Sequence, residues 1–170
     1  DATPTIEGIA EAGSTVELFN GDVSLGTTTA DETTGAYTIT PAALSDGAYS
    51  LTVTATDAAG NISGASDALS ITIDATAPGK PSIITTTSLT NDATPTIEGI
   101  AEAGSTVELF NGDASLGTTT ADETTGAYAI TPAALDDGAY SLTVKATDAA
   151  GNISAASDAL SMTVDATAPA

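Results

Sequence analysis

Within the stretch AYSLTVTATD at residues 48–57, apolar side chains alternate with those of serine and threonine from Tyr49 to Thr56. Its apolar positions run from Tyr49 to Ala55 in steps of two, and its serine and threonine positions run from Ser50 to Thr56. Successive side chains of a strand point to opposite faces, so this pattern predicts a strand with one buried face and one wet face. The stretch therefore indicates a sheet that covers a core on one side.

The same stretch recurs at residues 139–148 as AYSLTVKATD, because residues 92–170 repeat residues 1–79 at an offset of 91. The repeats differ at eight aligned positions, which are Val23/Ala114, Thr38/Ala129, Ser45/Asp136, Thr54/Lys145, Gly64/Ala155, Ile71/Met162, Ile73/Val164 and Gly79/Ala170. Solenoid repeats have periods of roughly 20 to 50 residues, so the longer period here matches a whole small domain. We expect two tandem domains, at residues 1–78 and 79–170, joined by a short, stiff, proline-containing linker at residues 74–81.

Residues 80–91 have no counterpart before Asp1. We therefore expect the first domain to lack its opening strand, as in a piece cut from a longer array. In the second domain, short runs between Gly, Asp and Asn turns predict seven strands. They are Ser82–Thr87, Thr94–Ala101, Thr106–Phe110, Ser115–Thr120, Ala127–Thr131, Ala139–Asp148 and Ala159–Asp165.

The number and length of these strands predict an all-β protein of two tandem immunoglobulin-like, fibronectin III-like β-sandwich domains, with about seven strands each. The run LDDGAY at residues 135–140, and its counterpart at residues 44–49, resembles a tyrosine corner. In that motif a tyrosine hydroxyl bonds back to the backbone just before it. The absence of Cys and Trp favours a fibronectin-like or bacterial type of domain over an antibody type.

Composition excludes several classes of function. The formal net charge is −21, from 23 acidic and two basic residues, so the chain cannot neutralise the phosphates of nucleic acid or bind an anionic membrane surface. No apolar run approaches the roughly 20 residues of a membrane span, so we expect no direct membrane insertion. With neither Cys nor His, the chain has no thiolate nucleophile, imidazole base, disulfide or usual zinc ligand.

Four motifs of the second repeat resemble the bacterial immunoglobulin-like tandem repeats of giant surface adhesins of the RTX/Bap type. They are NDATPTIEG at residues 91–99, AEAGSTV at 101–107, ATDAAGN at 146–152 and VDATAP at 164–169. The resemblance covers the whole chain. It implies extracellular extender modules that hold a binding tip away from a Gram-negative cell, in adhesion or biofilm formation, on a type I secreted protein.

Several acidic residues are candidate calcium ligands. In an immunoglobulin-type sandwich the B–C and F–G loops lie where the domain begins, while the last strand leaves at the opposite end. We therefore expect Asp74, at the exit of the first domain, to approach Glu102 and Asp148 of the second. Asn152 follows in the same loop as Asp148. Such oxygen ligands suit Ca²⁺, which takes six to eight of them, although Asp and Asn are also ordinary turn residues.

The same reasoning places further acids at the ends of each domain. Asp1 and Asp92 are turn residues expected beside Asp74 and Asp165, either to complete such a site or simply to shape a turn. The matching half-sites at the outer ends of the chain are Glu11, Asp57 and Asn61 at the start, and Asp165 at the end. Because each lacks a neighbouring domain, we expect these half-sites to bind calcium more weakly.

Neighbouring acid pairs offer a catalytic alternative, which we reject. Asp31-Glu32, Asp122-Glu123 and Asp136-Asp137 are adjacent in the sequence. Glycoside hydrolysis needs two carboxyl groups facing each other across a cleft, and adjacent residues project in different directions. The sequence therefore predicts a protein that is not an enzyme.

We expect a mechanical function, in which a monomeric rod extends in proportion to the number of repeats and each repeat contacts only its neighbours in the same chain. Calcium at the junctions would remove the repulsion between acids and stiffen the rod. Two alternatives stay open. The repeats could themselves bind carbohydrate or associate with one another, or they could be spacers in a secreted enzyme.

Overall fold

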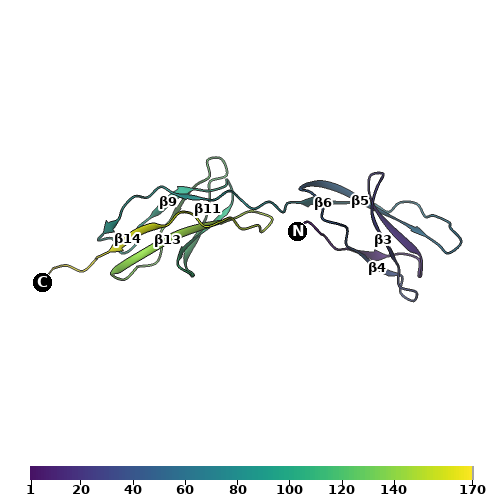
Figure 1. Cartoon of the computed structure of the whole chain (residues 1–170), viewed down its shortest axis with the longest axis horizontal. Coiled ribbons are helices and arrows are strands. Elements are labelled where there is room, and N and C mark those ends of the chain that lie inside the picture. Colours follow the sequence, from purple (N-terminus) through teal and green to yellow (C-terminus); the bar gives the residue numbers. More distant parts are fainter. Residues whose placement is uncertain (170) are drawn as a thin grey trace. The chain divides into compact units, whose positions relative to one another are not determined.

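The computed structural model describes residues 1–169, which form fourteen β-strands and two compact units, Asp1–Ala75 and Thr76–Ala170 (Figure 1). The first unit contains β1 (Ile6–Ile9), β2 (Thr15–Asn20), β3 (Val23–Thr29), β4 (Ala36–Ile39), β5 (Gly47–Thr56) and β6 (Leu69–Ile73). The second contains β7 (Ser82–Ile83), β8 (Leu89–Thr90), β9 (Ile97–Ile100), β10 (Thr106–Asn111), β11 (Ala114–Thr120), β12 (Ala127–Ile130), β13 (Gly138–Thr147) and β14 (Leu160–Val164).

The first unit is a sandwich of two sheets. One sheet pairs β1 with β4 in antiparallel register, so that Ile6 lies opposite Ile39. The other has the strand order β3-β2-β5-β6, with every pair antiparallel. The apolar positions of both sheets face inward, since Val16, Leu18, Ile39 and Leu51 are buried together. Burial of these apolar side chains between the two sheets stabilises the unit.

The second unit repeats this plan with one addition to each sheet. Its smaller sheet has the order β12-β9-β7, and its larger sheet has the order β11-β10-β13-β14-β8. The strand β7 adds antiparallel to β9, and β8 adds parallel to β14. The prediction of an all-β immunoglobulin-like sandwich is confirmed, and the described residues of the two units hold six and eight strands in place of about seven each.

The opening strand of the second unit differs from its prediction. The single strand predicted at residues 82–87 is wrong, because only Ser82–Ile83 of that range form a strand (β7), and the next strand, β8 (Leu89–Thr90), lies beyond the range and on the other sheet. Between them the chain leaves the smaller sheet after Ile84 and Thr85, whose amides both donate to the Glu98 carbonyl, at 2.8 and 3.4 Å. The segment crosses from one layer of the sandwich to the other, so its two halves pair with different partners. Sequence alternation alone does not report such a crossing.

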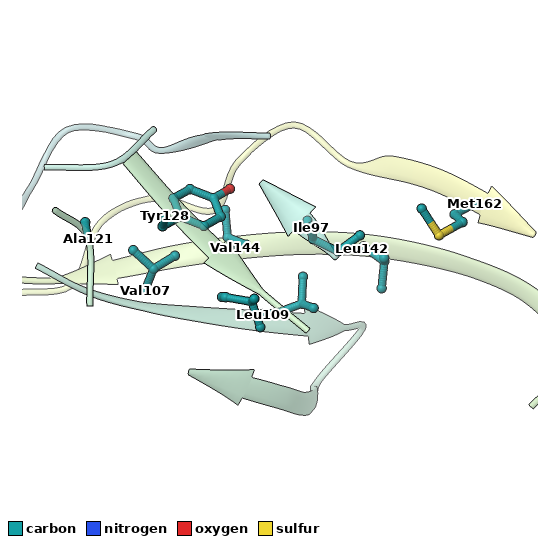
Figure 2. Packing of buried hydrophobic residues seen from close by; sticks show 9 residues of the cluster. Ile97, Val107, Leu109, Ala121, Tyr128, Leu142, Val144 and Met162 are labelled. Carbon is teal, nitrogen blue, oxygen red and sulfur yellow. The ribbon is translucent and has the colours of Figure 1, made fainter. Parts of the chain in front are cut away.

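The core of the second unit confirms the alternation seen in the sequence. Leu142, Val144 and Ala146 of β13 are fully buried, whereas Ser141 and Lys145 of the same strand are exposed. The largest cluster of buried side chains joins both sheets, as Figure 2 shows for the members Ile97, Val107, Leu109, Ala121, Tyr128, Leu142, Val144 and Met162. Tyr128 lies in this core at 4% exposure, so it does not contribute to an exposed aromatic surface.

The two tyrosine corners are confirmed. Tyr49 donates its hydroxyl proton to the Ser45 carbonyl at 2.8 Å, and Tyr140 donates to the Asp136 carbonyl at 2.9 Å. Each bond spans the loop that enters the longest strand of its unit. The corner therefore fixes the direction in which β5 or β13 begins, as in other immunoglobulin-like sandwiches.

Candidate functional site

Asp148 organises the loop between β13 and β14. Its Oδ1 accepts hydrogen bonds from the amides of Ala150 at 2.9 Å and Asn152 at 2.8 Å, and its Oδ2 accepts one from Nδ2 of Asn152 at 2.8 Å. The hydrogen bond from the Asn152 side chain is the main cause of a lowered pKa for the Asp148 carboxyl. The loop therefore holds an ionised carboxylate in a fixed orientation at one end of the unit.

Asp57 and Asn61 build the same turn in the first unit. The Asp57 carboxylate accepts from the amides of Ala59 at 2.9 Å and Asn61 at 2.8 Å, and from Nδ2 of Asn61 at 2.7 Å. The Asn61 side-chain bond again leads the causes that lower the pKa of Asp57. The hydrogen bonds within each turn are thus sufficient to explain why Asp and Asn occupy these positions.

Glu11 and Glu102 begin the loop that follows β1 or β9. Their backbone carbonyls accept from Ser14 and Ser105, while their carboxylates have no hydrogen-bond partner among residues 1–169. In the first unit Glu11 lines one groove together with Asp57 and Asn61. In the second unit Glu102 lines a hollow beside the segment at residues 79–82. The carboxylates of both glutamates are thus free to bind a cation.

The turn acids Asp1 and Asp92 each bond to a threonine two residues later. Oδ1 of Asp92 accepts from the amide of Thr94 at 2.8 Å and from its hydroxyl at 3.0 Å, and Asp1 does the same with Thr3 at 2.8 and 3.1 Å. These are local turns of the kind that Asp forms without a metal.

Asp165 and Asp74 lie just after the last strand of their units. The amide of Asp165 donates to the Thr90 carbonyl at 2.9 Å, and Asp165 and Asn91 line one hollow. The strand pairing of β8 with β14 therefore brings the start and the end of the second unit together. Asp74 is half-buried directly after β6.

Asp46 and Asp137, which the sequence did not single out as ligands, hold the exit segments. Asp46 accepts at Oδ1 from the Ala75 amide at 2.8 Å. Asp137 accepts from the Ala166 amide at 2.6 Å and from the Thr167 hydroxyl, and these bonds, led by that of Thr167, lower its pKa. In the sequence, each Asp directly precedes the glycine that begins the tyrosine-corner strand.

The oxygen donors fit a hard cation, and no unit holds a complete set by itself. Over residues 1–169, no group of three or more acidic side chains within either unit lies together in a metal-binding arrangement. Calcium needs six to eight oxygen ligands. Each unit contributes oriented single carboxylates and the amide oxygen of Asn61 or Asn152, so a calcium site would require further oxygens from elsewhere.

In two of the acid pairs considered for catalysis, the first carboxylate is hydrogen-bonded within its own turn. Oδ1 of Asp31 accepts from the amides of Thr33 at 3.0 Å and Thr34 at 2.6 Å, and Asp122 repeats this with Thr124 and Thr125. Both carboxyls have a lowered pKa, caused first by the amide bond of Thr34 or Thr125. A carboxylate that is hydrogen-bonded within its own turn is a poor proton donor.

In the part of the chain that the structure describes, no helix is long and apolar enough to cross a membrane.

The two-layer sandwich with an opening segment shared by both sheets and a tyrosine corner defines an immunoglobulin-like domain. The chain belongs to the bacterial Ig-like domain family, whose model matches residues 1–75 and 81–166. Each match falls on one of the two units, so each unit is one such domain.

Curated relatives include a chitinase and an exoglucanase. Chitinase A1 of Niallia circulans is 38% identical over 125 residues, covering 67% of this chain and 17% of that protein. Exoglucanase B of Cellulomonas fimi is 35% identical over 164 residues, covering 90% of this chain and 15% of that protein. The chain thus spans less than a fifth of the length of either relative.

Solved structures agree with the fold. The fibronectin(III)-like modules of Clostridium thermocellum CbhA match with a TM-score of 0.58 and 19% identity, over 95% of this chain and 85% of that one. The BSP domain of a biofilm-associated protein aligns over 97% of this chain and 28% of that one, at 25% identity and a TM-score of 0.43. The first of these supports the fibronectin-like sandwich.

Proposed function

We propose that the chain is a pair of structural extender repeats of a large bacterial surface adhesin, which hold a distal binding tip away from the cell. The observation that carries the proposal is the near-identity of two whole domains that differ at eight aligned positions. Selective recognition gains little from identical copies in series, whereas the reach of a tandem array grows with every copy. The setting we propose is extracellular, on the surface of a Gram-negative cell, with type I secretion.

The hydrogen bonds of the side chains support a passive role. In the first unit Asp31 and Asp57 use their carboxylates to close their own turns, and Asp122 and Asp148 do so in the second. In the core of the second unit, Tyr128 bonds to a backbone carbonyl. These are the features of a domain built to keep its shape, and a non-catalytic module is the function that they favour.

Calcium is the proposed cofactor that stiffens the array. Asp74 of one repeat, with Glu102, Asp148 and Asn152 of the next, would hold the ion, which supplies positive charge between acidic chain segments. The hydrogen bond from the Asn152 side chain lowers the pKa of Asp148, which keeps its carboxyl ionised to lower pH, and the Glu102 carboxylate has no hydrogen-bond partner among residues 1–169. Both conditions favour ligation of a cation.

Small-angle scattering on residues 1–170, titrated from chelator into millimolar calcium, tests the calcium mechanism. We expect the maximum dimension and the stiffness to rise to a plateau. D74N and E102Q should abolish the change. D113N is the matched control, because it removes the same charge from an exposed hairpin turn outside the proposed site. An unchanged profile in the unsubstituted chain would remove calcium from the mechanism and leave the extender role to the domains and their linker.

A second candidate function is a spacer within a secreted polysaccharide-degrading enzyme. The relatives named chitinase and exoglucanase favour it, because the chain matches a short part of each. The domains would then separate a catalytic domain from a substrate-binding one. Sequencing the complete gene separates the two functions, since a catalytic domain beside these repeats would replace the adhesin with an enzyme.

A further inference from the structure

The hairpin between β2 and β3 has an Asn-Gly pair at its tip, and so does the hairpin between β10 and β11. Asn20 pairs with Val23 across the two-residue turn Gly21-Asp22. Asn111 pairs with Ala114 in the same way. The two turn glycines have φ values of 58° and 60°, whereas the aspartate after each has a negative φ. Glycine with positive φ at the first central position is the pattern of a type II′ turn. The turn therefore requires its glycine, but it does not require the asparagine before it.

Each of these asparagine side chains points its carbonyl oxygen at the longest strand of its unit. Oδ1 of Asn20 accepts from the Ser50 amide at 3.2 Å, and Oδ1 of Asn111 accepts from the Ser141 amide at 3.1 Å. An N–H group aimed at a carbonyl oxygen stabilises the negative charge that develops there when a nucleophile attacks the carbon. Both Cγ atoms are therefore polarised toward nucleophilic attack.

The nearest nucleophile is the backbone nitrogen of the following glycine. Gly21 and Gly112 are exposed, and their amides have no hydrogen-bond partner in the part of the chain that the structure describes. Glycine has no Cβ to obstruct a close approach to its nitrogen. The rotation that brings this nitrogen to Cγ occurs at the last residue of β2 or β10, so it disturbs only the terminal pairs of the register. The tip therefore reaches the reactive geometry without unfolding of the sandwich.

The asparagines in the loops after β5 and β13 are arranged differently. Nδ2 of Asn61 donates to Oδ2 of Asp57 at 2.7 Å, and Nδ2 of Asn152 donates to Oδ2 of Asp148 at 2.8 Å. Each of these asparagines is followed by isoleucine, whose branched and stiff side chain crowds the neighbouring backbone nitrogen. The nitrogen that must leave is thus bound to a carboxylate, and the attacking nitrogen is shielded. Asn61 and Asn152 therefore serve as internal controls.

We propose that Asn20 and Asn111 are sites of spontaneous deamidation, one in each repeat. Asparagine is a chemically labile residue. The glycine nitrogen loses its proton and bonds to Cγ of the asparagine, the bond from Cγ to Nδ2 breaks, and ammonia leaves behind a five-membered succinimide ring. Water then opens the ring. Attack at Cγ gives aspartate, whereas attack at the main-chain carbonyl carbon gives isoaspartate. The reaction consumes one water, releases one ammonium ion and needs no oxidant.

The reaction changes the charge of the hairpin and, in part, its main chain. One neutral amide becomes a carboxylate in each repeat, so the formal net charge changes from −21 to −23 when both sites have reacted. The aspartate product keeps an oxygen for the Ser50 or Ser141 amide, and the sandwich stays intact. The isoaspartate product adds one carbon to the main chain and displaces the terminal pair of the hairpin.

The negative charge gained grows with the number of repeats, because every repeat of this sequence has one site. It also grows with the age of the molecule, since no step of the reaction runs backwards in water. The inference depends neither on calcium nor on the extender role.

Incubation of the folded chain of residues 1–170 at mildly alkaline pH tests the proposal, with samples cleaved after glutamate and analysed by mass spectrometry. Cleavage releases residues 18–32 with the first site and residues 109–123 with the second. The two fragments differ in mass because Val23 is replaced by Ala114, so each site is followed separately.

Each of these fragments should gain about 1 Da, because an amide is replaced by a carboxyl group. The gain should be at least roughly tenfold faster than at Asn61 and Asn152. Isoaspartate should accompany aspartate, since a succinimide ring opens in both directions. N111D is the matched variant. It should fold, show no change of mass in the second hairpin and leave the rate at Asn20 unaltered.

Four results would overturn the proposal. They are an unchanged mass at both hairpins, equal rates at the hairpin and loop asparagines, aspartate formed without isoaspartate, and reaction only after urea has unfolded the chain. The last result would mean that the folded hairpin protects its asparagine. The scattering test of calcium is independent, so either idea can fail alone.

Discussion

The Tyr128 hydroxyl donates to the Ser82 carbonyl at 2.8 Å across 46 residues of sequence, and it thereby joins strand β12 to the opening strand β7. The bond lies in the core, where Tyr128 is 4% exposed. Its counterpart Tyr37 makes no such bond to any of residues 1–169 and is only half-buried. The equivalent tyrosines therefore contribute differently to the stability of the two units, and a substitution in one unit is the control for the same substitution in the other.

Y128F should destabilise the second unit by about 1 to 2 kcal/mol, because it removes one hydrogen bond and leaves the Ser82 carbonyl buried without its donor. Y37F should change the first unit by less than about 0.5 kcal/mol, since no bond is lost. Urea unfolding followed by nuclear magnetic resonance gives both values from one sample, with the Met162 methyl group reporting the second unit. Equal effects in the two units would contradict the assigned role of β7.

The alkaline titration of the tyrosines should end with Tyr128. Burial raises its pKa to about 12. Because the folded pKa lies above the ordinary tyrosine value of 10.0, the contribution of Tyr128 to stability is complete below pH 10 and is lost as pH rises through about 12. Phenolate absorbance should therefore show a last step near pH 12 that coincides with loosening of the second unit. The step should be absent from Y128F.

G99A should be more harmful than G8A. A Cβ at Gly99 would lie 2.0 Å from the Ser82 carbonyl oxygen, which belongs to the backbone of β7, whereas one at Gly8 would meet only the side chain of Tyr37, at 2.3 Å. A side chain can rotate and a paired strand cannot. We expect a loss of roughly 2 to 3 kcal/mol for G99A, as for overpacking of a core, and less than about 1 kcal/mol for G8A. Similar melting temperatures for G99A and G8A would contradict the explanation that the backbone of β7 cannot move away from the added Cβ.

The sequence was sufficient for the fold because the alternation along residues 139–148 is strict and its neighbours repeat it. Leu142 and Val144 are buried as the pattern requires, and the tyrosine corner at Tyr140 has its expected bond. The break in the opening strand was not predicted, because the run SIITTT at residues 82–87 is rich in β-branched residues that favour a strand and does not alternate, so it does not indicate where the strand ends. The cause is tertiary, because the segment pairs with two sheets.

The candidate site was predictable only in its parts. Spacing in the sequence identified Asp148 and Asn152, and the structure shows both in one bonded turn. The roles of Asp46 and Asp137 were missed, because a bond to residues 29 or 30 positions away depends on how the last strand leaves the sandwich. The expected approach of Asp74 to Glu102 joins two units, and it stays a prediction.

Acid should loosen the turns at Asp57 and Asp148. Their folded pKa values are lowered below the ordinary aspartate value of 3.8, first by the side-chain hydrogen bonds of Asn61 and Asn152. A lowered pKa contributes stability that is present above 3.8 and is lost as pH falls through the folded value. Amide signals of Asn61 and Asn152 should therefore move below about pH 4. In D148N only the Asn152 signal should lose this dependence, and its persistence would assign the titration to another group.

V144A should cost the second unit roughly 2 to 3 kcal/mol, because Val144 is fully buried and its truncation leaves a cavity beneath β7. V53A should cost the first unit only about 1 kcal/mol, since Val53 already borders the open groove and water can fill the space. Unfolding of the two variants measures both losses. Equal losses in the two units would contradict the assigned difference in burial between Val144 and Val53.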